Sequence, residues 1–342
     1  ECQVQHWKEG GHDQLCKKVK RAGGAEQFHA NQKYSEAVAV AATACAEDTK
    51  GQTCYICTEA VHRHTGEGLV RGCACHTTEG FVHVSCLAEQ AKILVAEAEE
   101  NNLGFKVLGE RSDRWHTCSL CGQKYYGVVR CALGWACWKT YLGRPEQDWA
   151  RIGAIRQLGN GLFDADHHED CLSVREAELA MERRLGNSEH NMLDAQSNLA
   201  GTYQAVGRFE DALGIYRDAQ LYYARLYGEE HQNTLRQSNR YATCLLNLRR
   251  FAEAKSLLRR TIPVARRVLG ERDQFTLLLR WNYAQTLYND DAATLDELRE
   301  AVTSLEELER TARRVFGGAH PTTAGMELHL QDARVALRAR LK

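Results

Sequence analysis

Eight cysteine and histidine residues between positions 54 and 121 constrain this chain more than any other feature. They form four closely spaced pairs, Cys54–Cys57, Cys73–Cys75, His83–Cys86 and Cys118–Cys121. Four such pairs can hold two tetrahedral Zn²⁺ ions, because thiolate and imidazole suit zinc in softness and geometry. The pattern therefore predicts two structural zinc sites. The alternative is four pairs of reduced or disulfide-bonded cysteines.

The bulk composition excludes several classes of protein. The chain has 342 residues and a formal net charge of -1, so we expect neither nucleic-acid binding nor attachment to a charged membrane surface. No apolar run approaches the roughly 18–20 residues of a membrane span. Zinc thiolates must stay reduced, so the cysteine usage favours an intracellular location, cytoplasmic or nuclear. Only three prolines are present, which permits long helices.

Residues 51–126 carry finer signals in the spacing and the local sequence. A single residue separates Cys73 from Cys75, and seven more lead to His83. This spacing resembles that of the RING-CH zinc finger, and so do the local sequences Cys54-Tyr55-Ile56-Cys57 and Cys118-Ser119-Leu120-Cys121. The related PHD finger usually has a wider cysteine pair and a shorter step to histidine. The resemblance implies cross-bracing, with one zinc on Cys54, Cys57, His83 and Cys86 and the other on Cys73, Cys75, Cys118 and Cys121.

The RING-CH resemblance also implies a function. Such fingers usually act in ubiquitin ligases, where they hold a charged ubiquitin-conjugating enzyme (E2) beside a substrate, without a covalent catalytic residue. By resemblance, Ile56 and Leu120 contribute to the apolar patch that meets the E2. Two features depart from the family. Gln90 occupies a position that is commonly tryptophan, and the step from Cys86 to Cys118 is long, with a predicted helix over 87–101. A finger that keeps its zincs without recruiting an E2 is the alternative.

Residues 1–24 contain a second set of possible ligands. His12 and Cys16 have i,i+4 spacing, so on a helix both side chains can share one metal ion. With Cys2, the segment resembles the C-terminal half of a MYND zinc finger. The resemblance implies that Cys2, His12 and Cys16 are its last three ligands, in sites that are incomplete in this chain. The alternative is a basic surface helix. A helical linker is expected over 25–50.

From residue 143 onwards the sequence repeats. Four apolar–glycine pairs each end a unit, at steps of 42, 42 and 47 residues: Leu185-Gly186, Tyr227-Gly228, Leu269-Gly270 and Phe316-Gly317. A fixed period in this range predicts a helical solenoid. The longer last step predicts an insertion near 289–294, between two helices. Residues 127–142 are expected to form an aromatic connector before the repeats.

The repeats resemble tetratricopeptide repeats of the 42-residue type found in kinesin light chains. Shared markers include Glu230-His231-Gln232-Asn233-Thr234-Leu235 and Asn282-Tyr283-Ala284. Asn198, Arg240 and Asn282 share one column of the first helix. The resemblance implies that this column lines a concave groove and binds an extended peptide, whereas polar side chains can also simply solvate a helix. The run from His167 to Cys171 resembles a metal cluster, but the repeat alignment favours packing, with Cys171 at a small-residue position.

These observations predict a mostly α-helical protein, with a small cross-braced two-zinc finger followed by an α-solenoid of tetratricopeptide-type helical hairpins over 143–342. The predicted function is that of a ubiquitin-ligase-like adaptor. It recruits an E2 through the finger and a peptide or protein substrate through the repeats. The alternative is a non-catalytic interaction scaffold with structural zinc fingers. A metallo-hydrolase is not expected, because no zinc keeps an open position.

Overall fold

The computed structural model describes residues 12–73, 75 and 80–341. Within these residues the regular structure is helical, with two isolated antiparallel β-bridges, Val70–Val82 and Thr117–Lys124. The chain divides into two compact units, Glu1–Leu185 and Gly186–Lys342. The predicted fold class, mostly α-helical with a repeat solenoid, is confirmed. Among the described residues, no helix combines the length and the apolar character needed to cross a bilayer.

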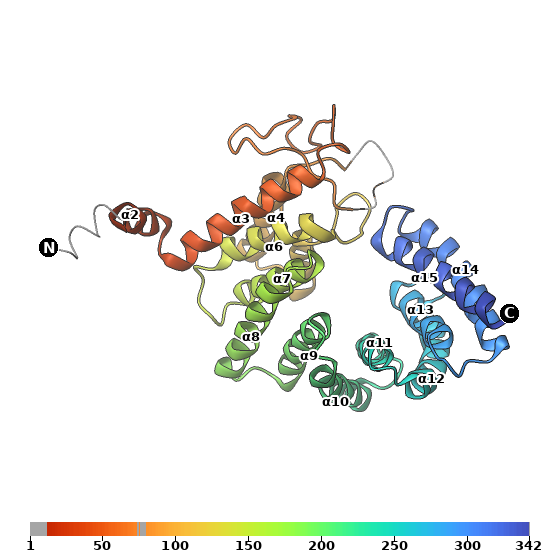
Figure 1. Ribbon diagram of the computed structural model, residues 1–342. Coiled ribbons are helices and arrows are strands. Elements are labelled where there is room, and N and C mark those ends of the chain that lie inside the picture. Colours follow the sequence, from red (N-terminus) through yellow and green to blue (C-terminus); the bar gives the residue numbers. More distant parts are fainter. Residues whose placement is uncertain (1–11, 74, 76–79, 342) are drawn as a thin grey trace. The chain divides into compact units, whose positions relative to one another are not determined.

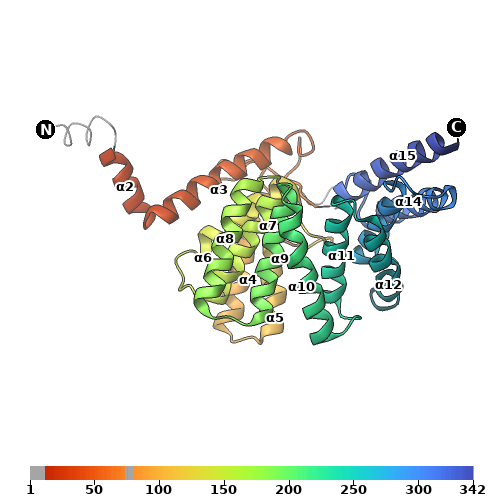
Figure 2. The same cartoon turned by 60° about the horizontal axis from the view of Figure 1, so that its bottom comes forward.

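The first unit contains the cysteine-rich segment and the helices around it. These helices are α2 (His12–Ala22), α3 (Ala25–Ala44), α4 (Val84–Glu100), α5 (Phe105–Ser112), the 3₁₀ turn η1 (Asp113–Trp115), α6 (Gly127–Tyr141), α7 (Trp149–Asp164) and α8 (His168–Leu185). In Figure 2, α6, α7 and α8 lie side by side. The expected helices over 25–47 and 87–101 correspond to α3 and α4.

Helix α6 is the segment expected as an aromatic connector. It is largely buried, and it packs more closely on α7 than large side chains would permit. A Cβ atom on Gly134 would lie 2.9 Å from the carbonyl oxygen of Gln157, and one on Gly161 would lie 2.7 Å from that of Arg130. Glycine at both positions therefore lets the two backbones approach each other.

The second unit is a row of helical hairpins (Figure 1). Its helices are α9 (Glu189–Ala205), α10 (Phe209–Tyr227), α11 (Gln232–Asn247), α12 (Phe251–Leu269), α13 (Gln274–Tyr288), α14 (Leu295–Val315) and α15 (Pro321–Leu341). Two of the glycines expected to end a repeat unit, Gly228 and Gly270, directly follow α10 and α12, with φ of 86° and 93°. This left-handed conformation suits glycine and ends a helix.

The repeat markers in the sequence stabilise the turns between units. The Nδ1 atom of His231 accepts a hydrogen bond from the backbone N–H of Asn233 at 3.2 Å, and the Thr234 hydroxyl donates to the carbonyl of Gly228 at 2.8 Å. His320 and Thr323 repeat both interactions before and within α15. The predicted insertion at 289–294 is the loop between α13 and α14.

Candidate metal centre

The first cluster of metal-ligand side chains comprises Cys54, Cys57, His83 and Cys86. Their sulfur and ring-nitrogen atoms all lie within 4.8 Å of one another. The Nδ1 atom of His83 lies 3.3 Å from the sulfur of Cys57 and 3.7 Å from that of Cys86. His83 is the N-cap residue of α4 and Cys86 lies in its first turn, so the start of this helix supplies half of the cluster.

The second cluster comprises Cys73, Cys75, Cys118 and Cys121, again with all four sulfurs within 4.8 Å of one another. The Cys75 sulfur lies 3.4 Å from that of Cys73 and 3.7 Å from that of Cys118. The two clusters take alternate pairs along the chain. The structure thus brings together the same two groups of four that cross-bracing implied.

Similar backbone turns present the Cys54–Cys57 and Cys118–Cys121 pairs. In each, the residue after the second cysteine has a left-handed φ, 64° at Thr58 and 70° at Gly122. Its N–H donates to the carbonyl of the first cysteine, at 2.8 Å and 3.0 Å respectively. In the first turn, the N–H groups of Ile56 and Cys57 also point to the Cys54 sulfur, at 3.4 and 3.5 Å. Such donors stabilise a thiolate.

The spacing of the ligand atoms fits a tetrahedral zinc ion. With Zn–S bonds of about 2.3 Å and Zn–N bonds of about 2.0–2.1 Å, tetrahedral geometry requires S···S edges of about 3.8 Å and N···S edges of about 3.6 Å. The contacts of 3.3–3.7 Å in the two clusters are close to these values. Both donor sets, three thiols with one imidazole and four thiols, are zinc-type sets. The two clusters could therefore each bind a metal ion.

The protonation of the ligands also suits metal binding. Burial lowers the pKa of His83, which favours the neutral ring that a metal requires. In the second cluster, hydrogen bonding from Cys73 lowers the pKa of Cys118 to about 4. The sulfurs are largely buried, apart from the partly exposed Cys57 and Cys121. None of the described cysteines forms a disulfide.

Ile56 and Leu120 occupy equivalent places, in the middle of the two similar turns. Both are exposed, 37% for Ile56 and 47% for Leu120, whereas Cys54 and Cys118 at the start of the two turns are buried. The hydroxyl groups of Tyr55 and Ser119 lie 3.3 Å apart and connect the two turns. The two apolar side chains are therefore presented by one linked substructure.

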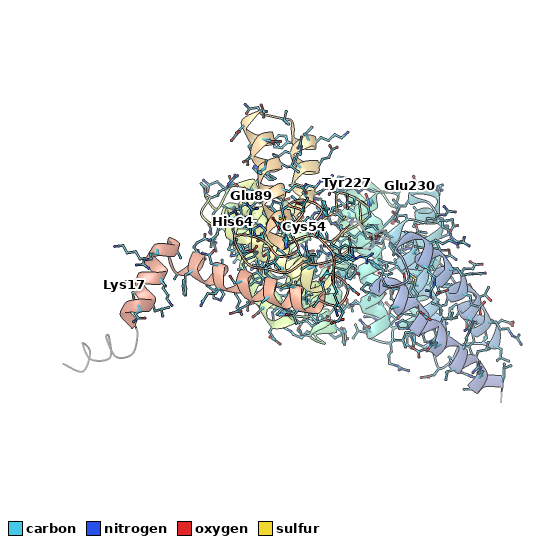
Figure 3. All side chains as sticks on the ribbon, turned by 90° about the horizontal axis from the view of Figure 1, so that it is seen from above. Lys17, Cys54, His64, Glu89, Tyr227 and Glu230 are labelled. Atoms are coloured by element: carbon cyan, nitrogen blue, oxygen red, sulfur yellow. The ribbon has the colours of Figure 1, made fainter. Side chains whose placement is uncertain are left out.

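A groove of about 560 Å³ lies along the first cluster and α4. It is lined by Ile56, His62, His64, Ser85, Cys86, Glu89, Gln90, Ile93 and Leu94. Leu120 is not among the lining residues. Figure 3 labels Cys54, His64 and Glu89 in this part of the molecule. The sequence marks Gln90 as a departure from the resembled family but gives no sign that it lines a groove.

The structure describes the surroundings of only one of the three residues that resemble MYND ligands, Cys16. Cys2 falls outside the described residues. His12 begins α2, and nothing is described of its side chain. Cys16 is exposed on the same helix, and neither group of metal-ligand side chains found among the described residues includes it. The MYND assignment of Cys2, His12 and Cys16 therefore stays a prediction.

The other cysteines near the metal clusters or in the repeats are packing residues. Cys171 is fully buried and its thiol donates to the carbonyl of Gly159 at 3.3 Å, as expected for a small-residue position. Cys131 and Cys137 are buried in α6. Neither belongs to a metal-ligand group among the described residues.

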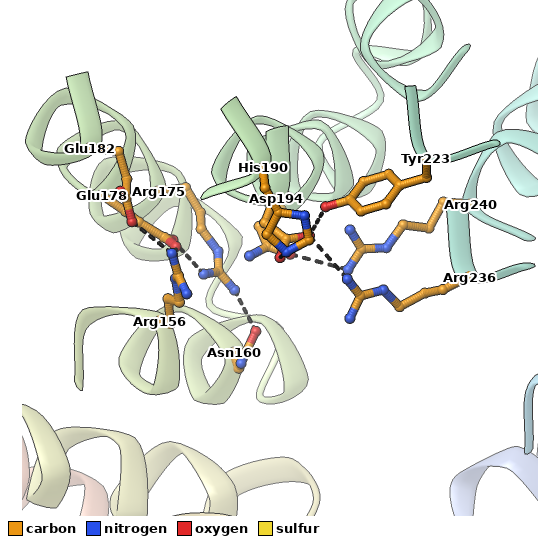
Figure 4. Close-up of polar contacts among 11 residues, drawn as sticks. Arg156, Asn160, Arg175, Glu178, Glu182, His190, Asp194, Tyr223, Arg236 and Arg240 are labelled. Carbon is orange, nitrogen blue, oxygen red and sulfur yellow. Dashed lines mark hydrogen bonds and ion pairs between the residues drawn. The ribbon is translucent and has the colours of Figure 1, made fainter. Parts of the chain in front are cut away.

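In the second unit, the column expected to bind a peptide forms hydrogen bonds between neighbouring repeats. The Arg240 guanidinium of α11 donates to the Asn198 side chain of α9 at 3.1 Å, and Arg236 pairs with Asp194 at 3.0 Å. Asn282 is buried, and its amide donates to Asn239 and Thr243 at 3.0 and 2.8 Å. Figure 4 shows Arg236, Arg240 and Asp194 close together, with Tyr223 also donating to Asp194.

A separate ion network lies within the first unit, between α7 and α8 (Figure 4). Glu178 and Glu182 are fully buried, and Arg156 contacts both at 3.2 and 2.7 Å. Arg175 pairs with Glu178 at 2.7 Å and donates to Asn160 at 2.6 Å. Each buried carboxylate thus has a charged partner, which indicates a structural role in this hairpin.

Comparison with known proteins identifies the repeats. A family model described as tetratricopeptide repeat matches residues 192–233 and 238–274, which confirms the predicted repeat type for this part of the chain. A search of curated proteins found no match.

Similar solved structures include the nearly identical TPR-like repeats from Podosopora anserina that are named after kinesin light chain. They show 17% identity and a TM-score of 0.42, and the match covers 68% of this chain and 97% of that one. Another is BtubC (BKLC) from P. vanneervenii, with 17% identity, a TM-score of 0.40, and 75% and 92% of the two chains covered.

Proposed function

We propose that this protein is a zinc-dependent interaction scaffold with ubiquitin-ligase-like character. The repeats hold a protein or peptide partner, and the two-zinc module recruits an E2. Tetratricopeptide repeats are protein-interaction elements, and the two clusters could bind metal. These two observations support an interaction scaffold, and E2 recruitment is the more specific part of the proposal. The cysteines of both clusters must stay reduced to bind zinc, which favours a reducing compartment, cytoplasm or nucleus.

The observation that carries E2 recruitment is the exposure of Ile56 and Leu120 at the two linked turns. Large apolar side chains presented singly on a surface are common, but two at equivalent places on the two linked turns form a repeated feature. The groove beside Ile56 adds Ile93 and Leu94 as further apolar contacts. Ligase action would then come from positioning the E2 thioester, since all eight ligand side chains would be occupied by metal.

The test is an autoubiquitination assay with a panel of E2 enzymes. We expect activity with at least one E2, and its loss in Ile56→Ala and Leu120→Ala with zinc content unchanged. Val61→Ala is the matched control, because Val61 is an exposed apolar residue of the same module, 57% exposed, and does not line the groove. Silence across the panel, with two zinc ions per chain by elemental analysis, contradicts ligase action.

A non-catalytic scaffold is the second candidate, and Gln90 favours it. Gln90 lines the groove at the position where the resembled family commonly carries tryptophan. An amide contributes less apolar contact area there than an indole ring would. If Gln90→Trp confers activity on an otherwise silent protein, the module has kept its zincs and lost E2 recruitment.

The partner site of the repeats is proposed on the α9, α11 and α13 side chains. Asn198, Arg240 and Asn282 remain the candidate contacts, although their hydrogen bonds with neighbouring helices already use part of their capacity. A partner peptide would have to compete with these interactions.

A further inference from the structure

The metal-ligand clusters and the helices of the first unit share one hydrophobic core. Sulfurs from both clusters, including Cys54 and Cys118, lie in the same buried set as Val38 of α3, Leu133 of α6 and Leu158 of α7. A zinc finger joined by a flexible linker would have its own small core. Here, the packing of the helices and the geometry of the ligands depend on the same contacts.

Helix α3 lies between α6 and the segment that connects the ligand pairs. Near its N-terminal end, the side chain of Gln27 donates to the carbonyl of Lys139 on α6 at 3.0 Å. After its C-terminal end, the Cys45 thiol donates to the carbonyl of Arg71 at 3.6 Å. A Cβ atom on Gly68 would lie 3.5 Å from the Cβ atom of Ala42, which is van der Waals contact. Residues 33–40 of α3 also line a pocket with Val128 and Cys131 of α6, so α6 borders both halves of α3, and the C-terminal end contacts the connecting segment in addition.

Four side chains from four parts of the unit meet at the start of α4. The backbone N–H of Ser85 donates to the Glu67 carboxylate at 2.7 Å, and the hydroxyl groups of Ser85 and Tyr34 lie 3.2 Å apart. The Lys139 ammonium lies 3.6 Å from the centre of the Tyr34 ring. Glu67 and Tyr34 are both only 9% exposed. Their polar groups therefore depend on these contacts.

Ser85 lies between two ligands of the first cluster, His83 and Cys86. The His83 ring faces the cluster and does not cap α4, and the Glu67 carboxylate accepts from the N-terminal turn in its place. Movement of the His83–Cys86 segment therefore disturbs both hydrogen bonds of Ser85, one to Glu67 on the connecting segment and one to Tyr34 on α3.

We propose that the first cluster is a metal-dependent latch on α3, operating through Glu67, Ser85 and Tyr34. It rests on the zinc binding proposed above. Bound metal fixes the His83–Cys86 segment and thereby holds the C-terminal half of α3. Loss of the metal removes this constraint, so that residues 34–45 open locally more often and expose the buried side of Tyr34, Val38 and Ala41, while the contacts of α3 with α6 remain.

Hydrogen exchange of the full chain, with and without a zinc chelator, tests the latch. On zinc removal we expect amide exchange over 34–45 to rise about tenfold or more, with a smaller change in α7 of the same unit and none in α13 of the second unit. If elemental analysis shows zinc and its removal leaves 34–45 protected, the latch is wrong but zinc binding stands. If the chain neither contains nor takes up zinc, the proposed zinc binding itself fails.

A pair of variants separates the latch from general unfolding. Tyr34→Phe removes the hydroxyl contact with Ser85 and keeps the ring, so exchange over 34–45 should rise while both zinc ions are retained. Ser35→Ala is the matched control, since the Ser35 hydroxyl donates only to Asn31 of its own helix, at 3.0 Å, on the exposed side. Equal exchange in the two variants would overturn the latch.

Discussion

Two glycines of α7 have opposite surroundings, although they lie on the same helix. Gly161 is buried against α6, where a Cβ atom would meet the carbonyl oxygen of Arg130 at 2.7 Å and the Cα of Cys131 at 2.9 Å. Gly153 has no atom within 4 Å of the corresponding position. Because backbone cannot move aside as a flexible side chain can, the first glycine is required by packing and the second is not.

We therefore expect Gly161→Ala to lower the free energy of unfolding of the first unit by about 1–3 kcal/mol, as overpacking does. Gly153→Ala should instead raise it by up to about 1 kcal/mol, because alanine is the better helix former. Urea denaturation of the two variants and the parent protein measures both. Equal stabilities for the two variants would mean that α6 and α7 pack less closely than the glycine contacts indicate.

The ligand residues of the clusters could be predicted from sequence, but their supports could not. Cysteine and histidine pairs carry their chemistry in their spacing, so Cys54 and His83 could be assigned to a shared site although 29 positions separate them. Glu67 shows no comparable signal. Its role depends on which N–H it reaches after folding, and a lone glutamate in a loop looks like any solvated charge.

At the scale of the elements, the histidine of the repeat marker is a helix-capping residue. In His320, the Nδ1 atom must carry a lone pair to accept from the N–H of Thr322 at the start of α15. Burial lowers the pKa of His320 below its usual value of 6.5, so the folded chain favours the neutral ring. Protonation removes the acceptor.

Stability should accordingly fall on acidification. Below about pH 6.5 the unfolded chain binds the proton before the folded chain does, so the stabilisation present at neutral pH is lost as pH falls through the lower, folded-state pKa. His320→Asn keeps a capping side chain that does not titrate, and its unfolding midpoint should decline less than that of the parent between pH 7 and pH 5. Thermal unfolding at both pH values measures the difference.

His320→Ala supplies the comparison for the capping interaction itself. It removes the acceptor at every pH and should lower the free energy of unfolding by about 1 kcal/mol near pH 7. The stability of the His320→Asn variant should lie between those of His320→Ala and the parent. If the parent and the asparagine variant lose stability in parallel on acidification, His320 does not account for the pH dependence.

Helices whose sequence repeats with a fixed period could be predicted, whereas a helix that is apolar on every side could not. The 42-residue period gave the hairpins of the second unit, the glycines that end α10 and α12, and the insertion after α13. Helix α6 has no polar face, because it is buried on nearly every side, so its sequence lacks the helical alternation of apolar and polar residues. The hydrogen bonds of Asn198 and Arg240 were not predictable either, since the period aligns equivalent residues without saying whether they touch.

At the scale of the whole molecule, the metal-ligand clusters and the repeats that match the family model lie in different compact units. Each unit has its own buried core, and both metal-ligand clusters lie in the first. We expect zinc removal to lower the midpoint of the unfolding transition of Glu1–Leu185, because structural zinc contributes directly to folding free energy. The transition of Gly186–Lys342 should remain.

Differential scanning calorimetry with and without chelator measures this response, and zinc re-addition serves as the control. Heating the zinc-free chain through this lowered transition should remove only part of the helical circular dichroism signal, since the helices of the second unit persist. A single transition that shifts as a whole would show that the two units unfold together, and an unchanged trace would show that the clusters contribute no metal-linked stability.

The polar bonds between α9 and α11 join residues 42 positions apart, Asp194 to Arg236 and Asn198 to Arg240. Each bond therefore connects a position to its own counterpart in the next repeat. Such a pattern sets a rule for insertions and deletions during evolution. Adding or removing a whole repeat changes the length of the array but lets counterparts meet again. Removing a few residues within a helix would shift every later counterpart out of line. Variation in length among related chains should thus fall in whole repeats or in inter-helix loops such as 289–294.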